Sequence, residues 1–178
     1  REMMRRLLKR KYEAVFITDH DAVWTDWDLA DQREQFPGLR IFPGLEKTLG
    51  SHHLLILGTN NEEYLRMDRP GDVLAKARDD GCLTVLAHPF RWRGGADLLE
   101  QTPLPDALEY LTCSQDGRAA RQALDAADRL GLPTINASDA HSVDMVGRYW
   151  IETERPIVDA IDLRQIILDG AYRSHPSR

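Results

Sequence analysis

Short apolar runs, many with β-branched residues, alternate along the chain with longer segments in which apolar residues recur every three or four positions. The short runs predict strands and the longer segments predict amphipathic helices. The predicted strands are 14–18, 39–43, 53–57, 83–87, 107–111, 134–137 and 148–151, and the predicted helices include 72–79, 119–130 and 162–168. This alternation favours one α/β domain over residues 1–178, with a largely parallel sheet.

Glycines mark the expected ends of the helices. Gly81, Gly131 and Gly170 stand just past the three helical segments, where a left-handed cap is expected. Residues 60–70 are the most polar stretch and are expected on the surface. The chain carries no glycine-rich phosphate loop or dinucleotide fingerprint, so the order of elements fits either an open sheet or a barrel.

The amino-acid composition limits the kinds of molecule that the protein is expected to bind. The 23 Lys and Arg against 29 Asp and Glu give a net charge of −6, which disfavours long nucleic acid and membrane surfaces but admits a small phosphorylated substrate. No apolar run approaches the roughly 20 residues of a membrane span, and the first residues do not resemble a signal peptide. Cys82 and Cys113 lie in apolar stretches and are expected to be buried free thiols. We expect a cytoplasmic protein.

Acidic residues and histidines gather at the ends of the predicted strands. Five of the six histidines lie there, with several carboxylates, in the order Asp19, His20, Asp21, Glu46, His52, His53, His88, Asp139 and His141. Barrel and open-sheet enzymes build their sites at the carboxyl ends of strands. Imidazole and carboxylate groups that converge there are suitable ligands for Zn, Mn or Fe, and a carboxylate can bridge two such ions.

Each residue alone also has an ordinary structural interpretation. Asp19 or Asp21 would serve as a helix cap, and Glu46 with Lys47 as a solvated ion pair. A single histidine beside a strand is more often a hydrogen-bonded structural residue than a metal ligand. The repetition favours the metal site, because helix capping uses Asp or Ser and has no need of histidine.

The motifs Thr18-Asp19-His20-Asp21, Pro43-Gly44-Leu45-Glu46, His53-Leu54-Leu55, Ala87-His88-Pro89 and Ser138-Asp139-Ala140-His141, in this order, resemble the PHP family, named for polymerase and histidinol phosphatase. The resemblance covers about residues 12–172. It implies a distorted seven-stranded (β/α) barrel, similar to a TIM barrel, that hydrolyses phosphate esters with two or three divalent metal ions.

The resemblance also implies roles for individual residues. Glu46 would bridge two ions; His53 and His88 would complete the first and Asp139 would bind the second, while His20 and His141 would hold a third. Arg91 is placed to meet a substrate phosphate, for which a guanidinium group is well suited, although a surface role is equally compatible with its position. Asp21 is a candidate to orient a ligand histidine, and His52, on the opposite strand face, is expected to be structural.

One family motif is missing. The family begins with a strand that carries a His-x-His pair, and this sequence has no such pair. We therefore expect a barrel that lacks its first strand, in either a fragment of a complete enzyme or a degenerate copy. The fragment is favoured because the six remaining ligands are all present.

The leading functional hypothesis is hydrolysis of a small-molecule or nucleotide phosphomonoester by a metal-activated water. A phosphodiesterase or exonuclease on the same scaffold is one alternative, and a non-catalytic module with a degenerate metal site is another. An amidohydrolase is a weaker alternative, because such sites usually include a lysine and Lys47 is the only one near a strand end. The metal, the leaving group and the oligomeric state stay open.

Overall fold

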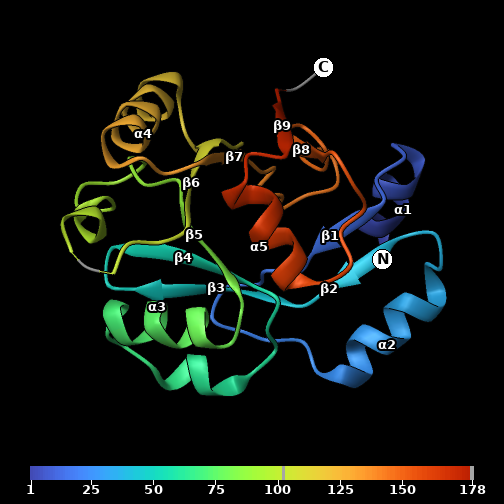
Figure 1. Cartoon of the computed structure of the whole chain (residues 1–178). Coiled ribbons are helices and arrows are strands. Elements are labelled where there is room, and N and C mark those ends of the chain that lie inside the picture. The colour runs from blue at the N-terminus through green and yellow to red at the C-terminus, as the bar shows by residue number, and fades with distance from the viewer. Residues whose placement is uncertain (102, 177–178) are drawn as a thin grey trace.

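A computed structural model describes residues 1–101 and 103–176 of the chain (Figure 1). The strands form three sheets. Strands β1 (Ala14–Phe16) and β2 (Arg40–Phe42) pair in parallel, and β8 (Trp150–Thr153) pairs antiparallel with β9 (Tyr172–His175). The central sheet has five strands in the order β3 (Gly44–Leu49), β4 (His52–Leu57), β5 (Leu83–Ala87), β6 (Ala107–Leu111) and β7 (Thr134–Asn136).

The central sheet is mixed, so the expectation of a largely parallel sheet is wrong for half of it. Strands β5, β6 and β7 run parallel, whereas β3 and β4 form an antiparallel hairpin and β4 is also antiparallel to β5. The hairpin follows from the two-residue turn Gly50-Ser51, in which Gly50 has a φ of 65°. Strand β3 was missed because Glu46, Lys47 and Thr48 interrupt its apolar pattern.

An isolated parallel bridge joins the β1 side of the molecule to the central sheet. It pairs His20 with Glu46, and its hydrogen bonds run from the Asp21 amide to the Glu46 carbonyl (2.9 Å) and from the Glu46 amide to the Asp19 carbonyl (3.2 Å). The mixed α/β class is confirmed. Among the described residues the three sheets do not close into a barrel.

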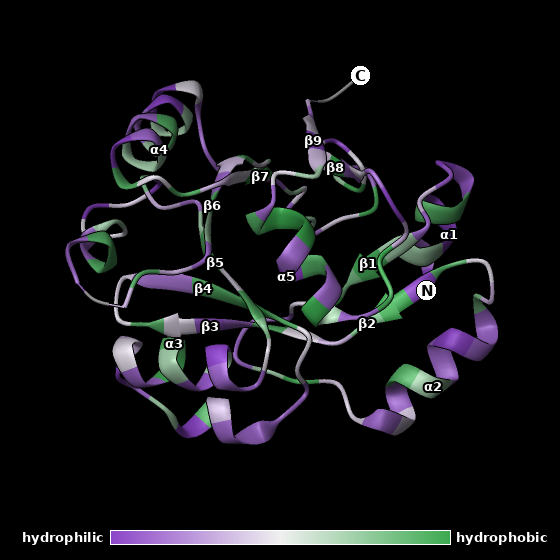
Figure 2. Cartoon of the chain, viewed as in Figure 1, coloured by the Kyte–Doolittle hydropathy of each residue, from purple (hydrophilic) through white to green (hydrophobic). Residues whose placement is uncertain are grey.

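The helices are α1 (Glu2–Lys9), α2 (Asp26–Gln35), α3 (Pro70–Asp79), α4 (Gly117–Leu130) and α5 (Ala160–Leu168), with short 3-10 turns η1 (Glu62–Arg66) and η2 (Asp97–Glu100). The three predicted helices are present, and Gly81, Gly131 and Gly170 are left-handed as expected. No bounds were predicted for helix α2, because it buries only Leu29 and Gln32 and its apolar periodicity is therefore weak. Figure 2 shows α2 as mostly hydrophilic and α5 as largely apolar.

The central sheet is buried on both faces. Leu54, Leu86 and Leu108 pack with α3 and α4 in one cluster, and their neighbours Leu55 and Val85 pack with α5 in a second. Side chains that alternate along a strand point to opposite faces, so near-continuous apolar runs supply both layers. No helix in residues 1–101 and 103–176 is long and apolar enough to span a membrane.

Two surface and burial expectations need correction. In the segment 60–70, Tyr64 is fully buried, because η1 turns its ring into the core while its hydroxyl donates to Asp80 (2.6 Å). Both cysteines are free, but only Cys82 is buried; Cys113 is partly exposed because it follows the end of β6.

Candidate metal centre

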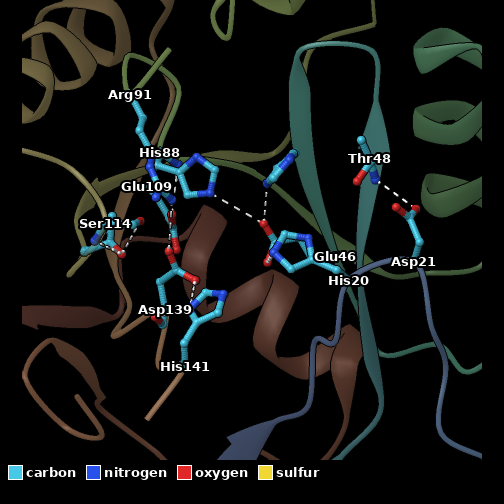
Figure 3. A network of polar contacts seen from close by, with 12 residues as sticks. His20, Asp21, Glu46, Thr48, His88, Arg91, Glu109, Ser114, Asp139 and His141 are labelled. Carbon is cyan, nitrogen blue, oxygen red and sulfur yellow. Dashed lines mark hydrogen bonds and ion pairs between the residues drawn. The ribbon is translucent and has the colours of Figure 1, made fainter. Parts of the chain in front are cut away.

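Glu46 lies at the centre of a cluster of three histidines (Figure 3). Its Oε1 is 2.7 Å from Nδ1 of His53 and 3.5 Å from Nε2 of His88, and its Oε2 is 3.6 Å from Nε2 of His20. Glu46 is only 5% exposed. A buried carboxylate needs hydrogen bonds or opposite charge to offset its desolvation, and the imidazoles supply them.

The strand register explains this convergence. Thr48 of β3 is opposite His53 of β4, so Glu46, two residues before Thr48, is a diagonal neighbour of His53 on the same face. His53 is in turn opposite Ala87 of β5, and His88 follows Ala87 directly. The isolated bridge places His20 beside Glu46 from the other side.

The histidines also fix the charge of Glu46. Burial alone would raise its pKa, but hydrogen bonds from His53 and His88, together with the charge of His20, outweigh burial and lower the pKa to about 2. Glu46 is therefore ionised at neutral pH. An anionic carboxylate surrounded by imidazoles is a donor set suited to a divalent cation.

The spacing of the donor atoms agrees with that chemistry. One potential ligand atom from each of His20, Glu46 and His53 lies within 4.8 Å of the other two. Ions such as Zn²⁺ bind nitrogen and oxygen at about 2.0 to 2.2 Å, so ligands on opposite sides of an ion are about 4 Å apart. These three donor atoms are therefore close enough together to form part of a metal centre.

A second group of predicted residues follows β7. Nδ1 of His141 lies 3.5 Å from Oδ1 of Asp139, and Nη1 of Arg91 lies 4.0 Å from Oδ2. Oδ2 of Asp139 is buried and has no hydrogen-bond partner among the described residues. The ring centroids of His20 and His141 are 6.0 Å apart, which brings the two groups together at one edge of the sheet.

Ser138 explains part of the polar end of β7. Its hydroxyl donates to the Tyr149 carbonyl and accepts from the Gly147 amide, both at 3.0 Å. These bonds hold the end of the long loop between β7 and β8 against the start of the same loop. Asp139 and His141 lie in this loop, so the same bonds help to fix their position.

Three residues of this edge have a left-handed backbone. Asp21, His88 and Asp139 have φ values of 44°, 31° and 47°. Such conformations are strained in residues other than glycine and concentrate at functional sites. In each case the chain turns sharply at the end of its strand or bridge.

Glu109 was not predicted as a site residue. It is 2% exposed, and its Oε2 accepts a hydrogen bond from the His88 amide at 2.9 Å. Burial, together with the charge of Asp139, raises its pKa to about 8. The signal in the sequence is an acid in the middle of the buried strand Ala-Leu-Glu-Tyr-Leu, a position that is costly unless the carboxyl group has a specific role.

Trp92 was also missed, although it follows the His-Pro motif by only three positions. Its ring lies edge-on to His53 and His88, with centroids 5.1 and 5.2 Å apart. The Arg91 guanidinium lies 4.4 Å from the centroid of the same ring. Trp92 therefore shields one side of the histidines and orders Arg91.

Two other candidate residues, Asp21 and His52, lie away from the cluster. Asp21 bonds to Lys47 (3.2 Å) and to the Thr48 amide (3.1 Å), and none of its described contacts is to a histidine (Figure 3). Burial raises the pKa of Asp21, but the bonds from Thr48 and Lys47 lower it overall. His52 is buried, with Nδ1 3.1 Å from the Gly95 carbonyl.

Comparison with known proteins supports the fold and agrees with the resemblance to the PHP family in part of the chain. A family model described as PHP-associated matches residues 117–172, whereas proteins with curated functions give no match. PsfC from Pseudomonas syringae PB-5123 is similar in structure, with a TM-score of 0.70 and 21% identity over 99% of this chain and 82% of that chain.

Two further structures are similar at low identity. One is a two-domain protein from Bacteroides vulgatus containing a predicted PHP-like metal-dependent phosphoesterase (TM-score 0.72, 14% identity, 99% of this chain and 60% of that chain). The other is an amidohydrolase from Chromobacterium violaceum with bound sulfate and no metal (TM-score 0.62, 18% identity, 96% and 90%). The match to the PHP-associated model agrees with the resemblance of the motifs to the PHP family, and the three structures support the fold.

Proposed function

We propose that this chain, assigned to the PHP family by its motifs and by these comparisons, belongs to a metal-dependent hydrolase of phosphate esters. The observation that carries the proposal is the ionised, buried Glu46, which has three histidine nitrogens within 3.6 Å of its oxygens. The substrate we propose is a small-molecule or nucleotide phosphomonoester. The similar fold of the predicted PHP-like phosphoesterase from Bacteroides vulgatus is consistent with this class of reaction.

The residues fit the divalent ions that the family implies. Imidazole nitrogens and carboxylate oxygens suit Zn, Mn or Fe, and Oδ2 of Asp139 is a buried acceptor without a hydrogen-bond partner among the described residues. We propose two or three ions, with Glu46 as the bridging ligand, His53 and His88 on one ion and Asp139 on the next. His20 and His141 would hold the third. A TIM-like barrel would place all six at one rim.

When bound, such ions supply an activated water nucleophile and stabilise the negative charge that develops on the phosphoryl oxygens. The chain supplies the positioning. Glu46 and Asp139 provide fixed negative charge to hold cations, and Trp92 excludes solvent from one side of His53 and His88. Arg91, 4.0 Å from Asp139, is the candidate to orient the substrate phosphate with its planar guanidinium.

Asp21 has a more indirect candidate role. Asp21 does not contact a histidine side chain among the described residues. Its bonds to Thr48 and Lys47 instead hold the segment that carries His20 against β3. Lys47 is held by Asp21 and by the Leu65 carbonyl, on the strand face opposite Glu46. A lysine-dependent amidohydrolase is therefore the less favoured alternative, although the Chromobacterium neighbour bears that name.

The test is turnover by the purified protein supplied with Zn, Mn or Fe. We expect phosphate release from small phosphomonoesters, and much slower release of nucleotides from an oligonucleotide or of alcohol from a phosphodiester. Nucleotide release without monoester turnover would establish the exonuclease or phosphodiesterase alternative. Stoichiometric metal binding without turnover of any of these esters would favour the non-catalytic module.

A further inference from the structure

A cavity of about 740 Å³ lies beside the metal centre, between the segment that follows β5 and helix α4. Arg91 and Trp92 line the cavity and also contact the centre, through Asp139 for Arg91 and through His53 and His88 for Trp92. Its volume is typical of a site for a small organic molecule and far exceeds that of one phosphate group. The cavity therefore has room for the part of a substrate that lies beyond the scissile phosphate.

The cavity wall is rich in arginine. Besides Arg91, it includes Arg93, Arg118 and Arg129. Within the described ranges 1–101 and 103–176, these three form no ion pair within 4.0 Å of a carboxylate. The charge of Arg118 does act on nearby Asp116, but guanidinium groups that are not held in an ion pair are available to a ligand anion.

Three acidic residues share the wall and offset part of this charge. Asp97 and Glu100 lie on η2, and Asp116 is the N-cap residue just before α4. Asp116 is already engaged, because its carboxylate accepts from the Arg118 and Ala119 amides at 2.9 and 2.8 Å. The four arginines still outnumber the carboxylates, so the charged wall is net positive.

Apolar side chains complete the cavity. Phe90 and Leu99 line it together with the ring of Trp92. A carbon skeleton packed on these groups would be held between the metal centre and the arginines. The wall thus combines an apolar surface with cationic groups, both next to the predicted point of hydrolysis.

We propose that this cavity binds a second anionic group of the substrate, a phosphate or a carboxylate, so that the substrate is a compact small molecule with two anionic groups. The inference rests on the proposed function for the first group, the scissile phosphate at the metal centre. Arg93 and Arg118 are the specificity-determining residues, because they line the cavity without contacting the predicted metal ligands.

The test compares α,ω-alkanediol bisphosphates of increasing chain length with the matching alkyl monophosphates and ω-carboxyalkyl phosphates. A charge-assisted hydrogen bond to arginine corresponds to roughly a tenfold to hundredfold gain. We expect kcat/KM for the best bisphosphate or carboxylate to exceed that of its monophosphate by this factor. A bisphosphate preference and a carboxylate preference distinguish the two kinds of second anion.

Arg118→Ala should abolish that preference by raising KM for the doubly anionic substrate, with kcat and the monophosphate unchanged. Arg121→Ala is the matched control, because Arg121 is an exposed arginine on the same helix that does not line the cavity. Equal kcat/KM for the doubly and singly anionic substrates at every chain length would overturn the proposal. An equal response to the two arginine variants would overturn it as well.

Calorimetric binding of the same bisphosphates separates this inference from the proposed function. If no ester is hydrolysed, the proposed hydrolase fails. The cavity assignment then stands if a bisphosphate binds to the wild type and Arg121→Ala at least about tenfold more tightly than to Arg118→Ala. Absence of binding, or equal binding to all three proteins, would overturn the cavity assignment itself.

Discussion

The candidate centre has two halves that differ in how firmly the protein holds them. On β3 and β4 and at the end of β5, the side chains of Glu46, His53 and His88 are 6%, 15% and 3% exposed, and both histidines contact Glu46. In the segments after β1 and β7, the side chains of His20 and His141 are 44% and 60% exposed. The first half is preorganised by strand register, whereas the second depends on local turns.

This contrast indicates how the site would assemble. Ligand residues on strands lose their conformational entropy when the sheet folds, because neighbouring strands fix their backbones. Exposed loop histidines retain side-chain freedom that an ion must restrict. Asp139 is intermediate: it follows β7 in a strained conformation but its side chain is only 9% exposed. We expect the sheet half to bind metal more tightly than the loop half.

The largest expected effect comes from the centre of the sheet half. Glu46→Gln keeps the shape of the side chain but removes the negative charge that two ions would share. Turnover should fall by roughly a thousandfold or more, which corresponds to the several kcal/mol that metal ions contribute to transition-state stabilisation. Phosphate release under saturating metal is the measurement.

Glu34→Gln is the control for that variant, because Glu34 is an exposed glutamate of α2 outside the site. Circular dichroism should show that both variants keep the fold. Wild-type turnover by a folded Glu46→Gln protein would exclude the bridging role.

The second effect concerns Glu109 in the metal-free protein. Its folded pKa of about 8 lies above the usual 4.5, so folding retains a proton that the unfolded chain releases. This contribution to stability is complete below about pH 4.5 and is lost as pH rises toward 8. At about 1.4 kcal/mol per pKa unit, the loss amounts to a few kcal/mol.

Urea denaturation between pH 5 and pH 8, with chelator present, measures this effect. Glu109→Gln should flatten the decline of the unfolding free energy, because the amide does not titrate yet can still accept from the His88 amide. The lowered pKa of Glu46 acts below about pH 4.5, outside this window. Identical pH slopes for wild type and variant would show that Glu109 is ionised throughout.

The smallest effect is expected in the loop half. His141→Ala should weaken the binding of one ion by roughly tenfold or more and leave the ions at Glu46 in place. His53→Ala should instead release metal from the sheet half. Metal titration with a competing chelator distinguishes the two, with His175→Ala as a control outside the site. Equal losses from His141→Ala and His53→Ala would remove the distinction between the halves.

The elements that could be predicted from the sequence are those whose side chains are buried. The bounds of β5 and β6 were predicted correctly, because both strands are buried on two faces and read as continuous apolar runs. Strand β3 escaped prediction because the residues that serve the candidate site, above all Glu46, replace the apolar ones. Helix α2 escaped because it lies on the surface and buries little.

The site shows a similar division. Histidines and acids at strand ends could be found from residue type and position, and the structure brings His20, Glu46, His53 and His88 together. Glu109 was overlooked although an acid inside a buried strand is a signal, and the significance of Trp92 depends on its contacts with His53 and His88, which the sequence does not display. The orientation of Asp21 toward Lys47 likewise depends on the unpredicted β3.

The most direct test of the metal centre is the elemental metal content of the protein, purified without chelator and checked by intact mass. We predict two or three equivalents of Zn, Mn or Fe per chain, and a loss of most of that metal in Glu46→Gln. Less than one equivalent in the wild type, after incubation with each metal and removal of the excess, would contradict the metal centre.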